Sequence, residues 1–257
     1  MKHFRIIPRL DLKNATVIKG IHLEGLRVVG DPVKLAENYA VEGADELLCM
    51  DAVASLYGRA PQPDVIAAIA AQLDIPLTVG GGIRSLEDAR TLLHAGADKV
   101  ALNTAAVRDP KLLSMIADEY GSQCIVLSID ARKVTPDTWE VFIEAGREKT
   151  GINVLEWAQH ACALGAGEIL LTSVDREGTY RGYDVELIRA VTGAVTVPVI
   201  AHGGADGPEA MLHAQEAGAD GAAASSIFHY GQWTPYTIKQ ALTALEVPLL
   251  RNDGPHV

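Results

Sequence analysis

The stretch that decides the fold is Pro76-Leu77-Thr78-Val79-Gly80-Gly81-Gly82, because it returns later in the chain as Pro198-Val199-Ile200-Ala201-His202-Gly203-Gly204. Internal repetition over such a distance indicates two fused half-domains. Two further pairs of segments match at the same spacing and without a gap: Ala95-Gly96-Ala97-Asp98 with Ala217-Gly218-Ala219-Asp220, and Gly43-Ala44-Asp45-Glu46 with Gly165-Ala166-Gly167-Glu168.

Working outward from the repeat, β-type runs alternate with longer helical patterns. Eight such runs favour a closed parallel (β/α)8 TIM barrel over an open sheet, which would not need so regular a count. No linker rich in Pro, Gly or Ser separates the halves, so residues 1–257 are predicted to form one domain, with half-barrels at about 1–120 and 121–257. The predicted strands are 4–11, 46–51, 76–80, 98–103, 124–130, 168–173, 197–202 and 220–225.

Each half supplies one carboxylate at the end of a strand. Asp11 closes the first predicted strand, and Asp130 closes the fifth, at a related place in the second half. A single aspartate there could simply cap the next segment or pair with a lysine. Two of them facing each other across a barrel favour a general acid and a general base.

Each half also supplies glycines at the start of a helical segment, where free backbone N–H groups favour an anion. A tight turn alone would also explain one glycine cluster. Because the clusters are duplicated, we predict two phosphate cradles and a ligand with a phosphate at each end. The first cradle comprises Gly82, Asn103 and Thr104, and the second comprises Gly204, Ser225 and Ser226.

Two irregular segments, 12–30 and 131–150, follow the first and fifth strands and are predicted to act as lids. The second contains an alternating stretch at 139–144 that predicts a small hairpin. Lys19, in the first segment, could reach an anionic substrate or could be a solvated charge. Asp51 and Thr172, near strand ends, are candidates for hydrogen bonds to substrate hydroxyls.

The other end of the predicted barrel carries alternating charges. Arg5, Glu46, Lys99 and Glu168 all lie near strand starts. Their arrangement is either a surface ring of ion pairs, which would add little stability, or a charged gate over the barrel axis.

Composition narrows the class. A net charge of −11 argues against a general nucleic-acid binder. Cys49, Cys124 and Cys162 have no metal-ligand spacing and are predicted to be buried, reduced thiols. No signal segment or membrane-spanning run is recognised, so we expect a cytoplasmic protein without membrane partners.

The chain resembles the cyclase subunits of imidazole glycerol phosphate synthase, from histidine biosynthesis, over almost its whole length. The resemblance rests on Arg5-Ile6-Ile7-Pro8 with Leu10-Asp11, Gly30-Asp31-Pro32-Val33, Leu77-Thr78-Val79-Gly80-Gly81-Gly82-Ile83-Arg84, Asn103-Thr104-Ala105-Ala106-Val107, Gly121-Ser122-Gln123, Gly167-Glu168-Ile169-Leu170-Leu171-Thr172-Ser173, and Ile227-Phe228-His229.

The resemblance implies a (β/α)8 barrel whose N-terminal face binds a glutaminase that sends ammonia through the barrel. It implies no metal or organic cofactor, and a bisphosphorylated ribulosyl aminoimidazole substrate that is cleaved and cyclised. It places the catalytic aspartates on Asp11 and Asp130, a glutaminase contact on Asp98, and a substrate lysine on Lys19. It also places the ammonia gate on Arg5, Glu46, Lys99 and Glu168, and the phosphate sites on Gly82, Asn103 and Thr104 and on Gly178, Gly204, Ser225 and Ser226.

Four departures from the family pattern are expected near the substrate: Arg9, Val53, Ala101 and His202, where the family usually has Cys, Thr, Ser and Ser. Glu177, in place of Asp, is a milder change. Strand alternation turns Arg9 to the same side as Asp11, so we predict that it pairs with Asp11 or Asp51 and that Arg9 and His202 affect specificity.

Three functions therefore stay open. The first is the synthase cyclase. The second is an ammonia-channelling partner of a sugar amidotransferase, as in the second-copy relatives found in surface-saccharide pathways, which Arg9 and His202 favour. The third is a sugar-phosphate isomerase, which the charged gate disfavours.

Overall fold

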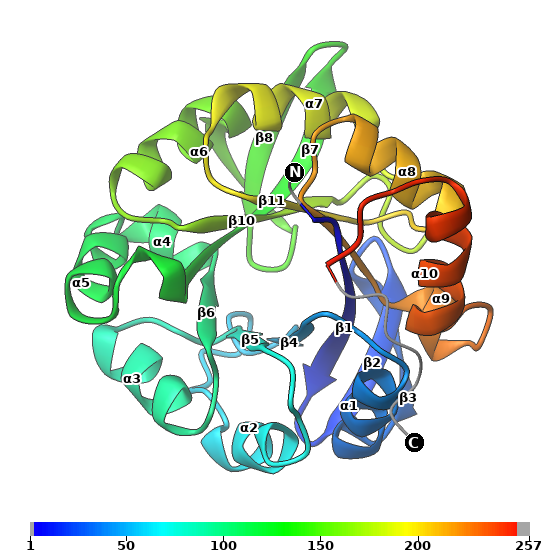
Figure 1. Ribbon diagram of the computed structural model, residues 1–257. Helices are drawn as coiled ribbons and strands as arrows, with labels where there is room; N and C mark the ends of the chain where they lie inside the picture. The colour runs from blue at the N-terminus through cyan, green and yellow to red at the C-terminus, as the bar shows by residue number, and fades with distance from the viewer. Residues whose placement is uncertain (1–2, 251–257) are drawn as a thin grey trace.

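The computed structural model describes residues 3–250, and it contains a closed barrel of eight parallel strands (Figure 1). The strand order runs from β10 through β11, β12, β1, β4, β5 and β6 to β7, and the pairing of β7 with β10 closes the ring. All eight predicted strands are confirmed. They are β1 (Arg5–Lys13), β4 (Leu47–Asp51), β5 (Leu77–Gly80), β6 (Lys99–Leu102), β7 (Ile125–Thr135), β10 (Glu168–Ser173), β11 (Val199–His202) and β12 (Gly221–Ala224).

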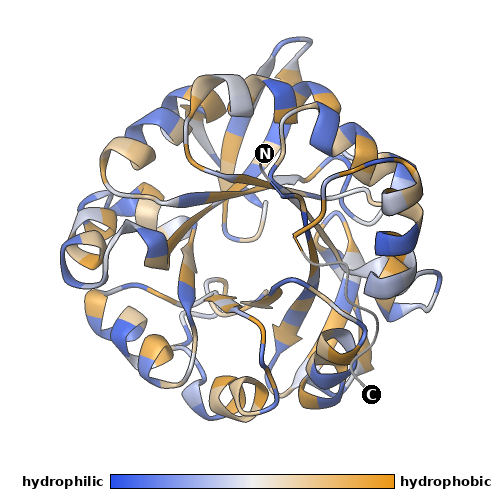
Figure 2. Cartoon of the chain, viewed as in Figure 1, coloured by the Kyte–Doolittle hydropathy of each residue, from blue (hydrophilic) through white to orange (hydrophobic). Residues whose placement is uncertain are grey.

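The helices surround the barrel and turn their apolar sides toward it, which leaves polar residues outside (Figure 2). Ser85 is the N-cap of α3, since its side chain accepts the Asp88 N–H, as the sequence predicts. The helical segments are α1 (Pro32–Val41), α2 (Pro63–Ala70), α3 (Leu86–His94), α4 (Thr104–Arg108), α5 (Lys111–Tyr120), η1 (Ser122–Cys124), α6 (Val154–Ala163), α7 (Val185–Ala194), α8 (Pro208–Glu216), α9 (Ser226–His229) and α10 (Pro235–Ala244).

The core has two layers, because each barrel strand buries both of its faces. The larger layer lies between the strands and the helices. The smaller layer fills the barrel interior, and it consists of Ile7, Leu48, Ala101, Val126, Leu170, Ile200 and Ala223. This interior layer separates the charged end of the barrel from the end that carries Asp11 and Asp130.

Three aspartates just before barrel strands have a structural use, and two of them, Asp98 and Asp220, occupy matching places in the repeat. Asp45 accepts the backbone N–H of Ile6, at 2.8 Å. Asp98 accepts that of Leu77, at 2.8 Å, and Asp220 accepts that of Val199, at 3.0 Å. Each aspartate therefore holds the first residues of a neighbouring strand.

Both predicted lid segments form antiparallel extensions. In the first, β1 continues into β2 (Thr16–Ile21) and β3 (Glu24–Gly30), which the sequence did not reveal as strands because β3 is largely exposed. In the second, the predicted hairpin is confirmed as β8 (Thr138–Ile143), but it pairs with a lengthened β7 and with an unpredicted β9 (Glu148–Asn153).

The cysteine prediction is correct in part. The three thiols are free, but only Cys49 is fully buried, whereas Cys124 and Cys162 are half-buried. Burial raises the pKa of the Cys49 thiol, so it stays protonated at neutral pH. Among the described residues, no helix has the length and apolar character that crossing a membrane requires.

Candidate active site

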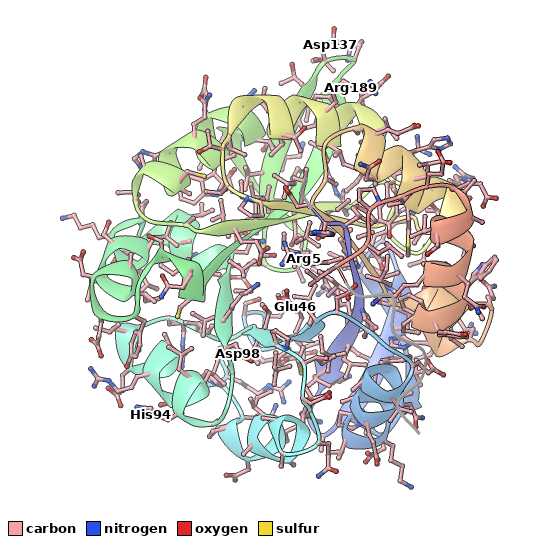
Figure 3. The ribbon with its side chains drawn as sticks, viewed as in Figure 1. Arg5, Glu46, His94, Asp98, Asp137 and Arg189 are labelled. Atoms are coloured by element: carbon pink, nitrogen blue, oxygen red, sulfur yellow. The ribbon has the colours of Figure 1, made fainter. Side chains whose placement is uncertain are left out.

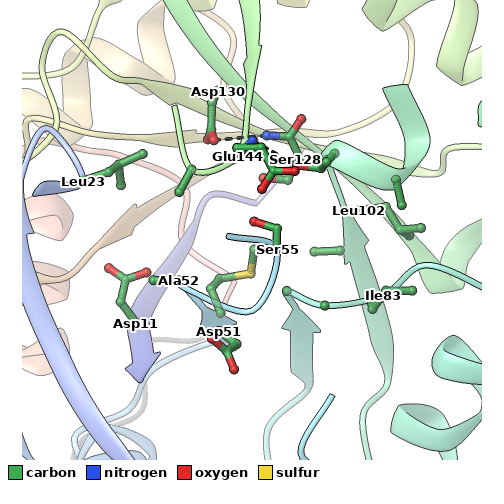
Figure 4. Close-up of a pocket in the computed structure, with 18 of the residues that line it drawn as sticks. Asp11, Leu23, Asp51, Ala52, Ser55, Ile83, Leu102, Ser128, Asp130 and Glu144 are labelled. Atoms are coloured by element: carbon green, nitrogen blue, oxygen red, sulfur yellow. Dashed lines mark hydrogen bonds between the residues drawn. The ribbon is translucent and has the colours of Figure 1, made fainter. Parts of the chain in front are cut away.

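A cavity of about 350 Å³ opens at the carboxyl ends of the barrel strands (Figure 4). Active sites of this fold are built at that end. Predicted site residues of both halves meet there: Asp11, Lys19, Asp51, Gly82, Asn103, Thr104 and Asp130, together with Arg9 and Ala101.

Asp130 is held from one side by Asn103, whose Nδ2 donates to Oδ2 at 3.1 Å and also donates to the Phe142 carbonyl. Burial raises the pKa of Asp130 to about 6, while the charge of Arg9 and the Asn103 hydrogen bond oppose that rise. The carboxyl group can therefore carry a proton near neutral pH.

Arg9 points into the barrel and pairs with Asp11, as predicted. Its Nε and Nη2 both lie 2.8 Å from Asp11 Oδ1. The alternative partner, Asp51, instead accepts the backbone N–H of Val53 and the Nε2 of Gln62. Arg9 and Asp11 are 6% and 4% exposed, so this is a buried ion pair.

His202 lies on the other side of Arg9. Its Nδ1 is 3.2 Å from Arg9 Nη1 and 3.1 Å from Thr172 Oγ1. Burial, followed by the charges of Arg9 and Lys19, lowers the pKa of His202 well below its usual value, so the ring is neutral. Because a guanidinium only donates, Nδ1 accepts and Nε2 carries the ring proton.

The first cradle forms one wall of the large cavity. Gly81 and Gly82 have φ values of 93° and 77°, where a side chain would be strained. A Cβ on Gly81 would also lie 2.3 Å from the Asp51 carbonyl. Within residues 3–250 the buried Asn103 Oδ1 has no hydrogen-bond partner, so it can accept one from a ligand.

The second cradle repeats this geometry in a much smaller space. Gly203 and Gly204 have φ values of 95° and 98°, and the buried Ser225 Oγ also has no hydrogen-bond partner in the described part of the chain. The adjoining cavity measures about 20 Å³, close to the volume for one water molecule. It is lined by the predicted Gly178, Gly204, Ser225 and Ser226, with Lys19, Glu177 and His202.

Lys19 borders both cavities but already has a partner. Its Nζ forms a buried ion pair with Glu177 and lies 4.0 Å from Asp11 Oδ2. Glu177 also holds the turn between β2 and β3, since Oε2 accepts the Leu23 N–H and the backbone carbonyl accepts the His22 N–H, both at 3.0 Å. The first insertion is therefore docked over the second cradle.

Some residues that the sequence placed near the substrate lie outside both cavities. Thr172 is fully buried, borders neither cavity, and its hydroxyl already contacts His202. Val53 is 2% exposed and borders neither cavity. Sequence reasoning missed Ser128, which lies two residues before Asp130 on the same face, and Glu144, which enters the pocket from a left-handed turn without glycine at its first position.

At the opposite end of the barrel the four charged residues form one closed ring, which we call the charge ring. Arg5 bonds Glu46, at 3.0 Å, and Glu168; Lys99 bonds the same two acids, at 3.1 Å and 2.7 Å. Figure 3 shows Arg5 and Glu46 near the centre of the barrel, far from the outer helices. The predicted alternation of charges is confirmed.

Within residues 3–250, no group of three or more His, Cys, Asp or Glu side chains is arranged to hold a metal ion.

A (β/α)8 barrel with two carboxylates and two glycine cradles at the carboxyl ends of its strands has the architecture of an enzyme. The comparisons with known proteins agree. Residues 5–234 match the family described as histidine biosynthesis protein. The chain is 54% identical, over 204 residues, to the imidazole glycerol phosphate synthase subunit HisF of Legionella pneumophila. The aligned residues make up 79% of this chain and 96% of that protein.

The chain therefore belongs to the histidine biosynthesis family and, within it, to the HisF-type subunits of imidazole glycerol phosphate synthase. The resemblance inferred from sequence motifs is confirmed, and the chain is an enzyme of histidine biosynthesis. These matches do not favour the saccharide-pathway partner or the isomerase.

Proposed function

We propose that this chain catalyses the cyclase step of imidazole glycerol phosphate synthase in the cytoplasm. It would take ammonia and a bisphosphorylated ribulosyl aminoimidazole substrate, cleave the substrate and close the imidazole ring. The observation that carries the proposal is the pairing of two repeat-related anion cradles with two carboxylates at one end of the barrel.

The two carboxylates have different environments, which suits two different proton transfers. Asp130, with a pKa raised to about 6, can hold a proton and donate it to an oxygen of the substrate. Asp11 is an ion-pair partner of Arg9, and its Oδ2 can accept a proton from the attacking nitrogen. No metal or organic cofactor enters this scheme.

The phosphates would bind at Gly82, Asn103 and Thr104 and at Gly178, Gly204, Ser225 and Ser226. The first cradle is open to the large cavity. The second must widen, so we propose that binding moves the turn at Leu23 and frees Lys19 from Glu177 to contact the substrate. Asp51 would bind a substrate hydroxyl, and Arg9 and His202 would adjust specificity.

The partner would be a glutaminase on the N-terminal face, whose ammonia enters past the charge ring. Arg5, Glu46, Lys99 and Glu168 would act as the gate, because their ion pairs surround the barrel axis below the apolar interior layer. Asp98, close to that ring and exposed, would contact the partner.

The decisive experiment incubates the purified chain with the bisphosphate precursor and an ammonium salt, and follows both products by mass spectrometry. We expect turnover without a partner, and its loss in Asp130→Asn. The exposed Asp64→Asn serves as a control for the same substitution. No turnover by the parent protein, with the precursor verified as intact, would contradict the proposed function.

A second experiment tests the gate. With the cognate glutaminase and glutamine as nitrogen source, Arg5→Ala should change glutamine-dependent turnover while ammonium-dependent turnover stays near the parent value. Equal effects on the two nitrogen sources would remove the support for a gate.

A further inference from the structure

Arg9 is the residue whose placement the cyclase reaction does not explain. It lies on β1 two residues before Asp11, on the same inward face, and makes its ion pair inside the barrel. Both of its contacts with Asp11 go to a single oxygen, Oδ1. The other oxygen, Oδ2, is left facing Lys19 Nζ at 4.0 Å.

The barrel has room for this side chain because a neighbouring strand is built from small residues. β12 lies between β1 and β11, and its Ala223 is in register with both Ile7 and His202. Ala223 belongs to the interior layer. Arg9 can therefore pass over an alanine to reach His202, two strands away.

The second contact anchors the guanidinium. Arg9 Nη1 donates to His202 Nδ1, and this histidine nitrogen also lies 3.1 Å from Thr172 Oγ1. Thr172 is in register with Asp130 on the adjacent strand β7. The series Asp11, Arg9, His202 and Thr172 thus extends around the barrel wall from one carboxylate-bearing strand to the neighbour of the other.

The charges argue against an extra anion site here. Arg9 is matched by Asp11, and Lys19 is matched by Glu177, so the two cations add no net positive charge to the pocket. A buried ion pair with good geometry restrains its members more than it stabilises the fold.

We propose that Arg9 is a positioning residue for the carboxylate pair: it occupies Asp11 Oδ1, leaves Oδ2 as the oxygen that exchanges protons, and extends its charge to Asp130. The inference rests on the proposed function for its kinetic consequence but not for its electrostatic one. Because two N–H groups of Arg9 occupy Oδ1, only Oδ2 of Asp11 stays open to the standard precursor, so Arg9 slows proton transfer by blocking one of the two oxygens.

The test follows the carboxyl carbon of Asp130 by ¹³C NMR through a pH titration, with the signal assigned by its absence in Asp130→Asn. The Arg9 charge lowers the pKa of Asp130 against the effect of burial. Arg9→Cys removes that charge and should move the titration midpoint upward from about 6 by about one pH unit. Arg9→Lys keeps the charge and should leave the midpoint near the parent value. An unmoved midpoint in Arg9→Cys, or an equal shift in Arg9→Lys, overturns the inference.

Two additions keep the experiment decisive. Arg9→Gln, which is close to arginine in size and neutral, takes the place of Arg9→Cys if the latter does not fold, with the same expected shift. Arg90→Cys, at a partly exposed position outside both cavities and kept reduced, controls for loss of an arginine elsewhere. Turnover of the bisphosphate precursor with ammonium, measured above the midpoint, should rise severalfold in Arg9→Cys. A parent without turnover contradicts the proposed function alone, whereas a parent with turnover and a slower Arg9→Cys contradicts the blocking of Asp11 Oδ1.

Discussion

The two half-barrels carry the same cradle in very different surroundings. The first cradle opens into a cavity of about 350 Å³, and the second adjoins one of about 20 Å³. Their glycine pairs have the same left-handed backbone. Within residues 3–250, each cradle also places a polar atom without a hydrogen-bond partner at a matching position, Asn103 Oδ1 and Ser225 Oγ. Duplication therefore preserves the backbone geometry of a cradle, and the loops around it decide whether a ligand can enter.

The loops differ because the two insertions dock in different directions. The turn between β2 and β3 lies on the second half, where a Cβ on Gly178 would come 2.9 Å from the Gly20 carbonyl. The turn after β8 instead contacts the start of α4, since Glu144 N–H donates to Thr104 Oγ1 at 3.0 Å. Only a residue without a Cβ at position 178 lets the turn between β2 and β3 lie so close to the second half.

The carboxylates differ in the same way. Asp11 has a cationic partner in Arg9, while Asp130 is held by the neutral amide of Asn103. Equivalent positions in the repeat have thus acquired unequal electrostatic surroundings, and variants of the two halves should separate catalysis from stability.

The largest effect expected is on turnover, and here the halves should behave alike. Asp11→Asn and Asp130→Asn each remove a group that exchanges a proton, which costs on the order of a hundredfold or more. Ammonium-dependent turnover of the precursor should fall by at least that factor in both, with circular dichroism unchanged. If one variant retains near-normal turnover, the two-carboxylate mechanism is wrong for that half.

Stability should separate the same two variants. In Asp11→Asn, Arg9 loses its buried anionic partner, and breaking such a pair costs about 3–5 kcal/mol. Asp130 is the opposite case, because its pKa in the folded protein, about 6, lies above the ordinary value of 3.8. Its contribution to the free energy of unfolding is therefore fully present below pH 3.8 and is lost as the pH rises through about 6. Asp130→Asn cannot ionise, so it avoids the cost of the buried charge and should stabilise the fold at pH 8 by at most about 3 kcal/mol.

Urea unfolding at pH 8 and pH 5 measures both changes. The gain of Asp130→Asn should shrink at pH 5, where the parent carboxyl is largely protonated, while the loss in Asp11→Asn should persist. If both variants lose stability equally at pH 8, the electrostatic difference between the halves is not as described.

Sequence patterns predicted most of what repetition and strand alternation determine. The eight strands, the inward turn of Arg9 and the alternation of the charge ring all follow from period and position along a strand. The contacts of Lys19 with Glu177 did not follow, because they depend on how a mostly exposed hairpin folds back across the barrel. Glu144 was missed for a related reason, since its turn uses left-handed residues that are not all glycine.

A smaller effect is expected on anion binding. Inorganic phosphate should occupy the first cradle of the parent protein more fully than the second. Glu177→Gln weakens the hold on Lys19 and on the turn at Leu23, so phosphate occupancy at Gly204 and Ser225 should rise. Crystals grown in phosphate report both occupancies, and the exposed Glu186→Gln is a matched control. An unchanged second cradle in Glu177→Gln would mean that another contact keeps it narrow.

The smallest effect concerns the repeated aspartates at the strand starts. Asp98 and Asp220 each accept one strand N–H, but Asp220 is 8% exposed, whereas Asp98 is exposed to solvent. A hydrogen bond of this kind contributes about 0.5–1.5 kcal/mol, and removing its acceptor costs more where the donor is buried. Asp220→Ala should therefore lower the free energy of unfolding more than Asp98→Ala does. If Asp98 contacts the glutaminase, Asp98→Ala should instead weaken subunit association, measured by titration calorimetry, while Asp220→Ala leaves it unchanged. Equal losses of stability with no change in association would show that both aspartates only hold strands.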